Sequence, residues 1–460
     1  MERVYPDDPG GRFDQPAGQE ARAPGQPDGY VLFDRSAGGE APAAGQPGSV
    51  VQPEVNGLFE LLEWGEARAA GQTGALQPTV QPAAAAPPAA AVQPAVQPGP
   101  AVAPPNPDAP PPRNRTRQLF VGAVPIGGGA PVAVQSMLNT KTTDVEASLA
   151  QIARLAESGC EIVRVAIPSR QALPGFGQIV EASPLPVVAD IHFDFRLAVE
   201  AVSLGAAKLR INPGNIGDLD MVDSIIDAAG AAGIPIRIGV NAGSLDAEVS
   251  ALAGLSHAAK LAISAERYVE HFHSRGFYDI VLSAKAHDVA TTVEAYRKLA
   301  RDLPEVPLHL GITEAGTFWQ GSIKSAVGIG ALLLDGIGDT LRVSLTADPA
   351  EELKVAWELL AAVGLRRLSP ELISCPTCGR CEVDLIEIAA EVERRLAEIS
   401  EPLKVAVMGC VVNGPGEARD ADVGVACGRG RGAIFSGGKI LYSVSEGEII
   451  DALFEEIDRL

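Results

Sequence analysis

The sequence reads IVRVAI at Ile162–Ile167, PVVADI at Pro186–Ile191, AKLRIN at Ala207–Asn212 and IPIRIGV at Ile234–Val240. Each of these runs is short and rich in β-branched residues, as buried parallel strands are. Four similar runs lie outside this stretch, at Val132–Met137, Asp279–Ala284, Leu308–Thr313 and Thr340–Leu345. Amphipathic helix-like segments separate them, for example Asp144–Ser158 and Ala286–Asp302. Strands that alternate with helices indicate parallel βαβ units.

Eight strand–helix units predict a closed (β/α)8 TIM barrel, which we place at residues 113–370. That length is close to the roughly 250 residues typical of the fold. A doubly wound open sheet is the alternative, but it usually has fewer strands and a Gly-rich first turn, which is missing here. The segment Arg117–Val124 predicts one short extra strand that covers the barrel floor.

The two ends of the chain differ from the barrel. Residues 1–112 hold 21 of the 36 prolines, contain no Lys and no Cys, and run through Gln-Pro, Ala-Ala and Gly-Gln repeats. Such a segment buries too little apolar surface to offset its ordering entropy, so we expect a disordered Pro/Ala/Gln/Gly-rich tail. Residues 371–460 predict a small α/β domain, with a helix-like run and two apolar runs at Asp384–Ile399, Leu403–Met408 and Asp422–Val425.

The charge balance limits the possible partners. The net charge is −21, from 37 Lys and Arg against 58 Asp and Glu. This balance disfavours nucleic-acid binding by non-specific charge, because the phosphate backbone would be repelled. No stretch approaches the roughly 18 apolar residues of a membrane span, and the first ten residues lack the apolar core of a secretory signal. We expect a soluble, cytoplasmic protein with no nucleic-acid or membrane partner.

Basic residues gather where the barrel strands end, which is where TIM-barrel chemistry takes place. Five of the eight strand ends supply a cation, namely Arg164, Arg210, Arg237, Lys285 and Arg342. In an acidic protein, such side chains converging on one mouth would repel each other unless an anion lay between them. Guanidinium groups suit bidentate capture of phosphate oxygens. The sequence therefore predicts a ligand with about two phosphates.

Two of the strand ends admit other roles. Lys285 could form a Schiff base with a carbonyl substrate, although facing a phosphate is the simpler role. Glu314 is the only acid at the seventh strand end, and it could transfer a proton or pair with a neighbouring arginine. Asp190 and His192 occupy alternate positions, and we favour hydrogen-bond scaffolding for them over metal binding. The other histidines show no ligand spacing, so we predict no role for them.

The cysteines of residues 371–460 predict a metal centre. A C-x2-C-x2-C run at Cys375–Cys381 is followed by Cys410. Structural disulfides are improbable in the cytoplasm, so metal binding is favoured. A tetrahedral zinc site usually needs two ligand pairs, whereas an iron–sulfur cluster accepts widely separated ligands. An iron–sulfur cluster therefore fits better, and zinc is the alternative. Counting alone would assign the cluster to Cys375, Cys378, Cys381 and Cys410. We expect Cys160 and Cys427 to be small buried hydrophobes.

Together these motifs resemble the 4-hydroxy-3-methylbut-2-enyl diphosphate synthase family, iron–sulfur reductases of the non-mevalonate isoprenoid pathway. The resemblance covers residues 116–460 almost continuously. It rests on VQSM (Val134–Met137), NTKTTD (Asn139–Asp144), ADIHFD (Ala189–Asp194), LRINPGN (Leu209–Asn215), RIGVNAGS (Arg237–Ser244), GITEAG (Gly311–Gly316), CPTCGR (Cys375–Arg380) and GCVVNGPGE (Gly409–Glu417).

The resemblance implies a [4Fe–4S] cluster held by three cysteines and one glutamate, here Cys375, Cys378, Cys410 and Glu417. Cys381 falls where the family generally has no ligand, so this chain could in principle hold an all-cysteine cluster. We favour Glu417, because a carboxylate on the unique iron can exchange for a substrate oxygen, whereas a fourth thiolate would leave the iron closed.

The resemblance also implies the reaction: reductive ring opening and dehydration of 2-C-methyl-D-erythritol 2,4-cyclodiphosphate to (E)-4-hydroxy-3-methylbut-2-enyl diphosphate. Glu314 would help with proton delivery, and Asn413 would reach in from beside the cluster. Reduced flavodoxin or ferredoxin would donate the electrons, and in a homodimer the cluster domain of one subunit would cap the barrel of the other. The diphosphate would be held by Arg164, Arg210, Arg237, Asn241, Lys285, Arg342 and Ser344.

Two readings compete with this one. A zinc-stabilised phosphometabolite sensor with an interaction tail is the non-enzymatic alternative. A Schiff-base aldolase that uses Lys285 would have no need of the cysteines. Neither alternative explains both the Cys410–Glu417 motif and the arginine-rich mouth.

Overall fold

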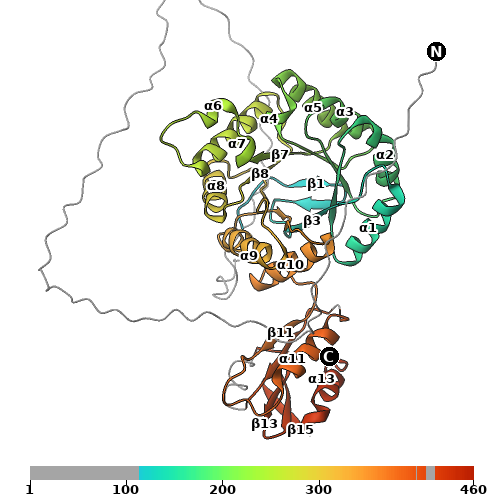
Figure 1. Ribbon diagram of the computed structural model, residues 1–460, viewed down its shortest axis with the longest axis vertical. Coiled ribbons are helices and arrows are strands. Elements are labelled where there is room, and N and C mark those ends of the chain that lie inside the picture. The colour runs from blue at the N-terminus through green and yellow to red at the C-terminus, as the bar shows by residue number, and fades with distance from the viewer. Residues whose placement is uncertain (1–112, 400, 411–419) are drawn as a thin grey trace, which may run out of the picture. The chain divides into compact units, whose positions relative to one another are not determined.

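A computed structural model describes residues 113–399, 401–410 and 420–460 (Figure 1). The predicted tail, residues 1–112, lies outside the described residues. Within them, no helix has both the length and the apolar character required to cross a membrane.

Eight parallel strands form a closed TIM barrel, which confirms the predicted fold class. In chain order they are β3 (Ala133–Met137), β4 (Ile162–Ala166), β5 (Val187–Asp190), β6 (Lys208–Ile211), β7 (Ile236–Asn241), β8 (Ile280–Lys285), β9 (His309–Leu310) and β10 (Thr340–Leu341). The sheet order is β8-β7-β6-β5-β4-β3-β10-β9. A parallel bridge between Leu282 and Leu308 joins the two ends of this order, so the sheet closes on itself.

Helices surround the barrel (Figure 1). The longer ones are α1 (Val145–Glu157), α2 (Leu173–Ala182), α3 (Phe195–Ser203), α5 (Leu219–Ala232), α7 (His257–Ser274), α8 (Val289–Asp302), α9 (Phe318–Leu334) and α10 (Pro349–Ala362). The short helices α4 (Pro213–Ile216) and α6 (Ala247–Ser250) lie in the loops after β6 and β7. Several helices begin just after a capping side chain that accepts a backbone N–H, as Asp144, Asp288 and Asp348 do. These caps start the helices on the side where the strands end.

Successive side chains of each strand point alternately to the apolar core between the barrel and its helices and to the interior of the barrel. Val163 and Val165 of β4 belong to the apolar core between the barrel and its helices. Arg164 lies between them in sequence, so its side chain points into the barrel, as the two-residue period of a strand requires. The same alternation turns Lys208, Arg210 and Arg237 inward.

The barrel floor is covered by a hairpin, so the prediction of a single extra strand was wrong. β1 (Leu119–Val121) and β2 (Val124–Ile126) pair in antiparallel fashion across a tight turn. Gly122 occupies this turn with a φ of 58°, a left-handed conformation that glycine adopts at little cost. Val121 and Ile126 pack against residues at the amino-terminal ends of three barrel strands, namely Ala133, Ile162 and Val188.

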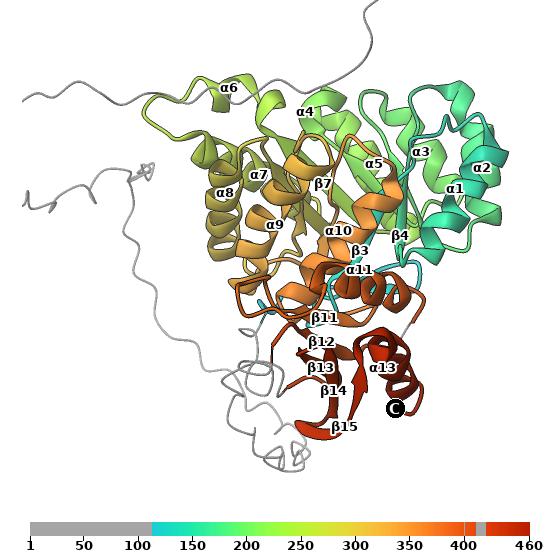
Figure 2. The same ribbon diagram turned by 60° about the horizontal axis from the view of Figure 1, so that its bottom comes forward.

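In its described residues, 371–399, 401–410 and 420–460, the C-terminal domain contains a five-stranded mixed sheet and two α-helices (Figure 2). Its strands are β11 (Glu371–Ser374), β12 (Lys404–Met408), β13 (Val423–Gly428), β14 (Arg431–Ser436) and β15 (Lys439–Ser445). β11, β12 and β13 run parallel, and β13, β14 and β15 antiparallel. Helices α11 (Leu385–Leu396) and α13 (Ile449–Ile457) share one apolar core with this sheet. The predicted helix and both predicted apolar runs correspond to α11, β12 and β13, whereas β11, β14 and β15 were not predicted.

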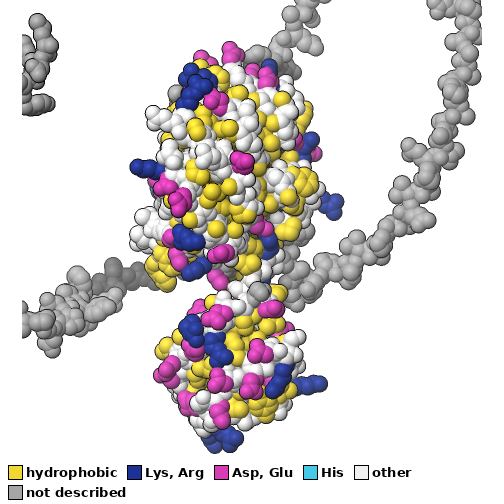
Figure 3. All heavy atoms as spheres, turned by 90° about the vertical axis from the view of Figure 1, so that its right-hand side faces the viewer, with side chains coloured by type: hydrophobic (Ala, Val, Ile, Leu, Met, Phe, Trp, Pro, Cys, Tyr) yellow, Lys and Arg dark blue, Asp and Glu magenta, His cyan; other side chains and the backbone are white. Residues whose placement is uncertain are grey.

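On the face of the molecule drawn in Figure 3, acidic and basic side chains are interspersed with apolar ones over the barrel and over the C-terminal domain.

Candidate functional site

The barrel interior holds the basic side chains that the strand ends predicted. Arg210 of β6 lies against Gly239 of β7, where a Cβ would come within 2.9 Å of Arg210 Nε. Lys285 at the end of β8 lies against Gly311, where a Cβ would come within 2.6 Å of Lys285 Nζ. Inward-facing glycines on neighbouring strands therefore provide the space that these two cations occupy.

A buried carboxylate from β5 pairs with two of the arginines. Arg210 Nη1 donates to Asp190 Oδ1 at 3.0 Å, and Arg164 Nε lies 3.7 Å from Asp190 Oδ2. His192 Nε2 is 3.3 Å from the same carboxylate, which agrees with the scaffolding role expected for this pair. Burial alone would raise the pKa of Asp190, but Arg164, the hydrogen bond with His192 and Arg210 together hold it below its usual value. Asp190 is therefore a permanent anion within the cation cluster.

Arg342 also has a carboxylate partner, from outside the strands. Its Nη2 and Nε donate to Glu352 of α10 at 2.9 and 3.1 Å. Glu352 Oε1 accepts a further bond from the Leu345 N–H. This role of Glu352 was not predictable, because acids in the first turn of a helix are common owing to the helix dipole.

Arg237 is different, because it is buried and forms no ion pair with a carboxylate of the described residues. It is 1% exposed, and its Nε and Nη1 have no hydrogen-bond partner within the described residues. Burial, followed by the fields of Arg164 and Arg210, lowers the pKa of Arg237 well below its usual value. A desolvated guanidinium of this kind is costly unless an anion completes it.

The remaining barrel residues of the predicted site lie around the mouth. Asn241 ends β7 and Ser344 follows β10, and both are partly buried. Glu314 is exposed in the loop after β9, and its φ of 53° is one of two positive values outside glycine among the described residues. Non-glycine residues in this region are uncommon and are enriched at functional sites.

Two interior residues, Lys208 and His309, were not predicted as part of the site. Lys208 begins β6 and is fully buried, and its Nζ reaches Gln135 Oε1 of β3 at 3.5 Å. His309 of β9 is also fully buried, and it bonds Thr340 through Nδ1. The predicted site includes only residues at the carboxyl ends of the strands. Lys208 lies at the start of β6, two residues before Arg210, and its side chain points into the barrel as that of Arg210 does. The two-residue period was the signal that could have identified it.

The cysteines of the C-terminal domain meet at the ends of two neighbouring parallel strands. Cys375 follows β11, and Gly409 and Cys410 follow β12. The Gly409 N–H donates to Cys375 Sγ at 3.4 Å. A Cβ at Gly409 would lie 2.9 Å from Cys381 Sγ and 3.5 Å from Cys375 Sγ. Glycine thus leaves room for two sulfurs beside Cys410, and soft thiolates are the ligands that iron–sulfur clusters take.

The other predicted ligands are less well placed. Cys378 is exposed, while Glu417 and Asn413 lie outside the described residues. Within the described part of the chain, no three His, Cys, Asp or Glu side chains form a ready metal site. Cys160 and Cys427 are buried in apolar cores as expected, and burial raises the pKa of each thiol to about 12.

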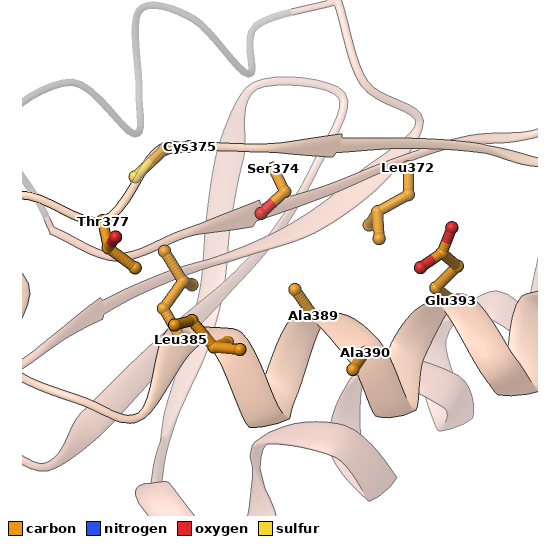
Figure 4. Close-up of a pocket in the computed structure, with 9 residues that line it drawn as sticks. Leu372, Ser374, Cys375, Thr377, Leu385, Ala389, Ala390 and Glu393 are labelled. Atoms are coloured by element: carbon orange, nitrogen blue, oxygen red, sulfur yellow. The ribbon is translucent and has the colours of Figure 1, made fainter. Parts of the chain in front are cut away.

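An open cavity of about 430 Å³ lies beside this cysteine edge, between β11 and α11. Cys375 and Thr377 lie at one end of it and Glu393 at the other (Figure 4). Leu372, Leu385 and Ala389 contribute to its apolar lining. The cysteine edge of the domain is therefore accessible from this side.

Comparisons with known proteins cover both folded parts of the chain. The family model described as the GcpE TIM-barrel domain matches residues 116–357, and the GcpE protein C-terminal domain matches residues 371–459. The chain is 54% identical over 346 residues to the 4-hydroxy-3-methylbut-2-en-1-yl diphosphate synthase (flavodoxin) of Geobacter sulfurreducens, covering 75% of this chain and 98% of that protein. It is 53% identical over 355 residues to the Salinispora arenicola protein of the same name, covering 76% and 91%.

Proposed function

The chain belongs to the GcpE family, and on that premise we propose that it reductively opens 2-C-methyl-D-erythritol 2,4-cyclodiphosphate and dehydrates it to (E)-4-hydroxy-3-methylbut-2-enyl diphosphate. It is thus an oxidoreductase of isoprenoid biosynthesis. The observation that carries the proposal is the buried Arg237, whose nitrogens lack acceptors within the described residues. A diphosphate supplies those acceptors, and it offsets the excess of positive charge around Asp190.

Each side chain around the mouth has a part in holding this ligand. Arg164 and Arg210 are held in position by Asp190, and Arg342 by Glu352, so their guanidinium groups meet the phosphates without reorganising. Glu314, exposed at the mouth, is placed to deliver the proton that the leaving hydroxyl requires. The residues that we assign to the diphosphate are Arg164, Arg210, Arg237, Asn241, Lys285, Arg342 and Ser344.

The cofactor belongs to the C-terminal domain. The family is one of iron–sulfur enzymes, and such a centre supplies the two electrons one at a time. We assign a [4Fe–4S] cluster to Cys375, Cys378, Cys410 and Glu417. Cys381 lies against Gly409 beside Cys375, so it is the residue that competes with Glu417 for the fourth position.

Iron content decides between these two fourth ligands. Glu417→Ala should lower the iron retained after anaerobic gel filtration, and Cys381→Ser should leave four irons per chain and an unchanged visible spectrum. If Cys381→Ser loses the cluster while Glu417→Ala keeps it, the cluster has four cysteine ligands.

The electron donor follows from the relatives. Their printed names specify flavodoxin, which we propose as the donor here, with ferredoxin as the alternative. The open cavity beside Cys375 allows a second protein to approach the cysteine edge. We place both proteins in the cytoplasm, where thiols stay reduced.

We also propose a homodimer, in which the C-terminal domain of one subunit covers the barrel mouth of the other. Cluster and cations must reach one substrate, and the rim of the mouth offers an apolar surface. Large apolar side chains are exposed in the segments that follow four barrel strands. Phe193 and Leu255 lie in loops, and Leu219, Phe318 and Trp319 lie at the starts of helices α5 and α9. Exposed apolar groups that cluster in this way are typical of interaction surfaces.

Anaerobic iron and sulfide analysis, followed by turnover with the cyclodiphosphate and a one-electron reductant, tests the proposed function. We expect a brown protein that forms the allylic diphosphate. A zinc-stabilised sensor would be colourless and would bind the ligand without converting it. A Schiff-base enzyme would instead be trapped on Lys285 by borohydride. Either result would overturn the proposal.

A further inference from the structure

A second layer of polar groups lies deeper in the barrel than the phosphate-binding arginines. Lys208 is the inward-facing residue that precedes Arg210 on β6, and it is completely buried. Its neighbour in register on β5 is Val188, which packs on the floor hairpin. The hairpin residues Val121 and Ile126 are themselves 0% exposed. The Lys208 amine is therefore shut off from solvent on the floor side of the barrel.

Four strands, β3, β4, β7 and β9, contribute neutral or basic groups around this amine. Gln135 of β3 is its hydrogen-bond acceptor at 3.5 Å, and the Gln135 Nε2 has no partner among the described residues. Arg164 of β4 and Arg237 of β7 are the charged groups that act on it most strongly. The nearby inward-facing His309 of β9 leaves its Nε2 without a partner in the described structure.

The acids of this region are committed elsewhere. Asp190 of β5 pairs with Arg164, Arg210 and His192, and Glu352 of α10 pairs with Arg342. Within the described residues no carboxylate forms an ion pair with Lys208 or with Lys285 at the end of β8. Arginine does not release its proton in proteins, whereas a buried lysine does. The lysines are thus the groups able to relieve the excess of positive charge.

We propose that Lys208 is a proton-accepting positioning residue: its amine is neutral in the ligand-free enzyme, and it takes one proton from solvent when the diphosphate binds above it. The inference rests on the proposed function, since it requires a doubly negative ligand among the arginines. The proton passes from buffer to Nζ, and no bond of the substrate changes. In the complex, the negative charge of the substrate and the positive charge of Lys208 stabilise each other. In the empty site, the neutral amine adds no further buried positive charge.

The electrostatics of the interior agree with this assignment. Burial, and then the fields of Arg237 and Arg164, lower the pKa of Lys208 well below its usual value. The negative charge of phosphate oxygens would oppose the field of these arginines and raise the pKa of Lys208 again. Burial, and then the fields of Arg237 and Arg164, also hold the pKa of His309 well below its usual value, so the imidazole stays neutral. Lys285 shows the same direction of shift, and the test must separate it from Lys208.

Calorimetric titration measures the proton directly. The oxidised holoenzyme, kept anaerobic and without reductant, binds the cyclodiphosphate without turnover. Repeating the titration at pH 8 in buffers of different ionisation enthalpy gives the number of protons taken up. We expect net uptake by the wild type, and an affinity that falls as the pH rises, by up to about tenfold per pH unit for each proton.

Two variants assign the proton to Lys208. Lys208→Arg is permanently charged, so uptake should fall by up to about one proton while binding persists. Gln135→Glu leaves the lysine in place but gives it a carboxylate partner, so it should remain charged in the empty site and lose the same uptake. His309→Gln is the matched control, and it should keep the wild-type uptake.

The outcomes separate this inference from the proposed function. Wild-type binding without proton uptake overturns the inference and leaves the proposed function intact, and that measurement needs no variant. Binding with unchanged uptake in Lys208→Arg and Gln135→Glu also overturns it, because Lys285 would then be the acceptor. If the wild type does not bind the cyclodiphosphate at all, the proposed function fails and the inference fails with it.

Discussion

Arg237 shows how a site can be identified from what a side chain lacks. A surface arginine is solvated and says little, but this one is buried and has nitrogens without acceptors in the described structure. Its neighbours Arg164 and Arg210 raise the cost further, because they carry the same charge. Such an arrangement is retained for the ligand it binds, at the expense of the stability of the empty protein.

Replacing Arg237 with methionine should therefore separate stability from activity. Arg237→Met removes a buried charge, so we expect the free energy of unfolding of the ligand-free enzyme to rise by about 1–4 kcal/mol. The same change should lower kcat/KM by about 10²-fold or more, since the phosphate loses a charged donor. Denaturant unfolding and anaerobic turnover measure the two effects. A variant that unfolds more easily and keeps its kcat/KM would contradict this account.

Asp190 is expected to behave in the opposite way. Because its pKa in the folded state lies below its unfolded value of about 3.9, the carboxylate stabilises the protein above that value and the benefit is lost as the pH falls. Asp190→Asn should cost about 3–5 kcal/mol at pH 7, since it leaves Arg164 and Arg210 uncompensated. It should also reduce the acid-induced loss of stability between about pH 5 and pH 3.

Urea unfolding at several pH values tests this expectation for Asp190. The matched control is Asp194→Asn, which removes a carboxylate paired with Arg196 at the exposed start of α3 but keeps a good helix cap. We expect the control to change stability by less than about 1 kcal/mol. Equal losses in the free energy of unfolding for the two substitutions would show that Asp190 stabilises the protein no more than an exposed carboxylate does.

Sequence reasoning at the residue scale was sound where one position carries its own signal. Lys285 ends β8 and Arg342 follows β10, as the rule that strand ends carry chemistry predicts. Arg237 was wrongly predicted at a strand end, because it is the second of the six residues of β7, although its side chain is buried in the barrel interior. Partners brought from a distance carry no such signal. Glu352 meets Arg342 only because α10 packs against β3, the sheet neighbour of β10, and a helix acid gives no hint of this in the sequence.

The strands of the barrel determine how much space the basic side chains of the site can occupy. The short strand β9 ends one residue before Gly311, and Lys285 of β8 fills the place where a side chain would be. The eight strand runs could be read from the sequence because the β-branched stretches are bounded and evenly separated. The floor hairpin could not be read so well, because its two strands are only three residues each and lack room for a periodic pattern.

Adding one methyl group directly after β9, at Gly311, should lower the stability of the protein and weaken substrate binding. In Gly311→Ala the new Cβ would lie 2.6 Å from Lys285 Nζ and 2.8 Å from the Arg342 carbonyl oxygen, which belongs to the backbone and cannot rotate away. We expect a loss of about 1–3 kcal/mol in stability and a higher KM. The matched control is Gly330→Ala on α9, where no atom lies within 4 Å, and it should stabilise by about 0.5–1 kcal/mol. Thermal unfolding and initial rates of both variants distinguish a steric effect from a general cost of alanine.

At the scale of the whole molecule, the chemistry is divided between two domains of one chain. The cations belong to the barrel, and the cysteines lie at an edge of the C-terminal sheet. The sequence indicated this division through a change in residue composition near Pro370, and both family models respect it. The subunit that supplies each half of a working centre cannot be read from composition, because two identical chains have identical patterns.

Mixing inactive subunits tests the proposed division of labour. Arg237→Ala should disable the barrel, and Cys410→Ser should disable the cluster, so each homodimer is inactive. If the cluster domain covers the partner's barrel, a mixed dimer keeps one intact centre, and an equal mixture regains about a quarter of the wild-type activity when subunits exchange at random. Turnover after co-refolding or co-expression measures this, and no recovery would indicate closure within a single chain.

The hairpin beneath the barrel has a kinetic consequence. With β1 and β2 packed under the strands, the floor of the barrel is closed, so ligands reach the basic side chains only from the opposite face. Substrate arrival, departure of the allylic product and release of water must then take turns at the same opening. The product should therefore inhibit competitively towards the substrate, and the rate at which the entrance uncovers sets a ceiling on turnover that no improvement in the chemical steps can raise.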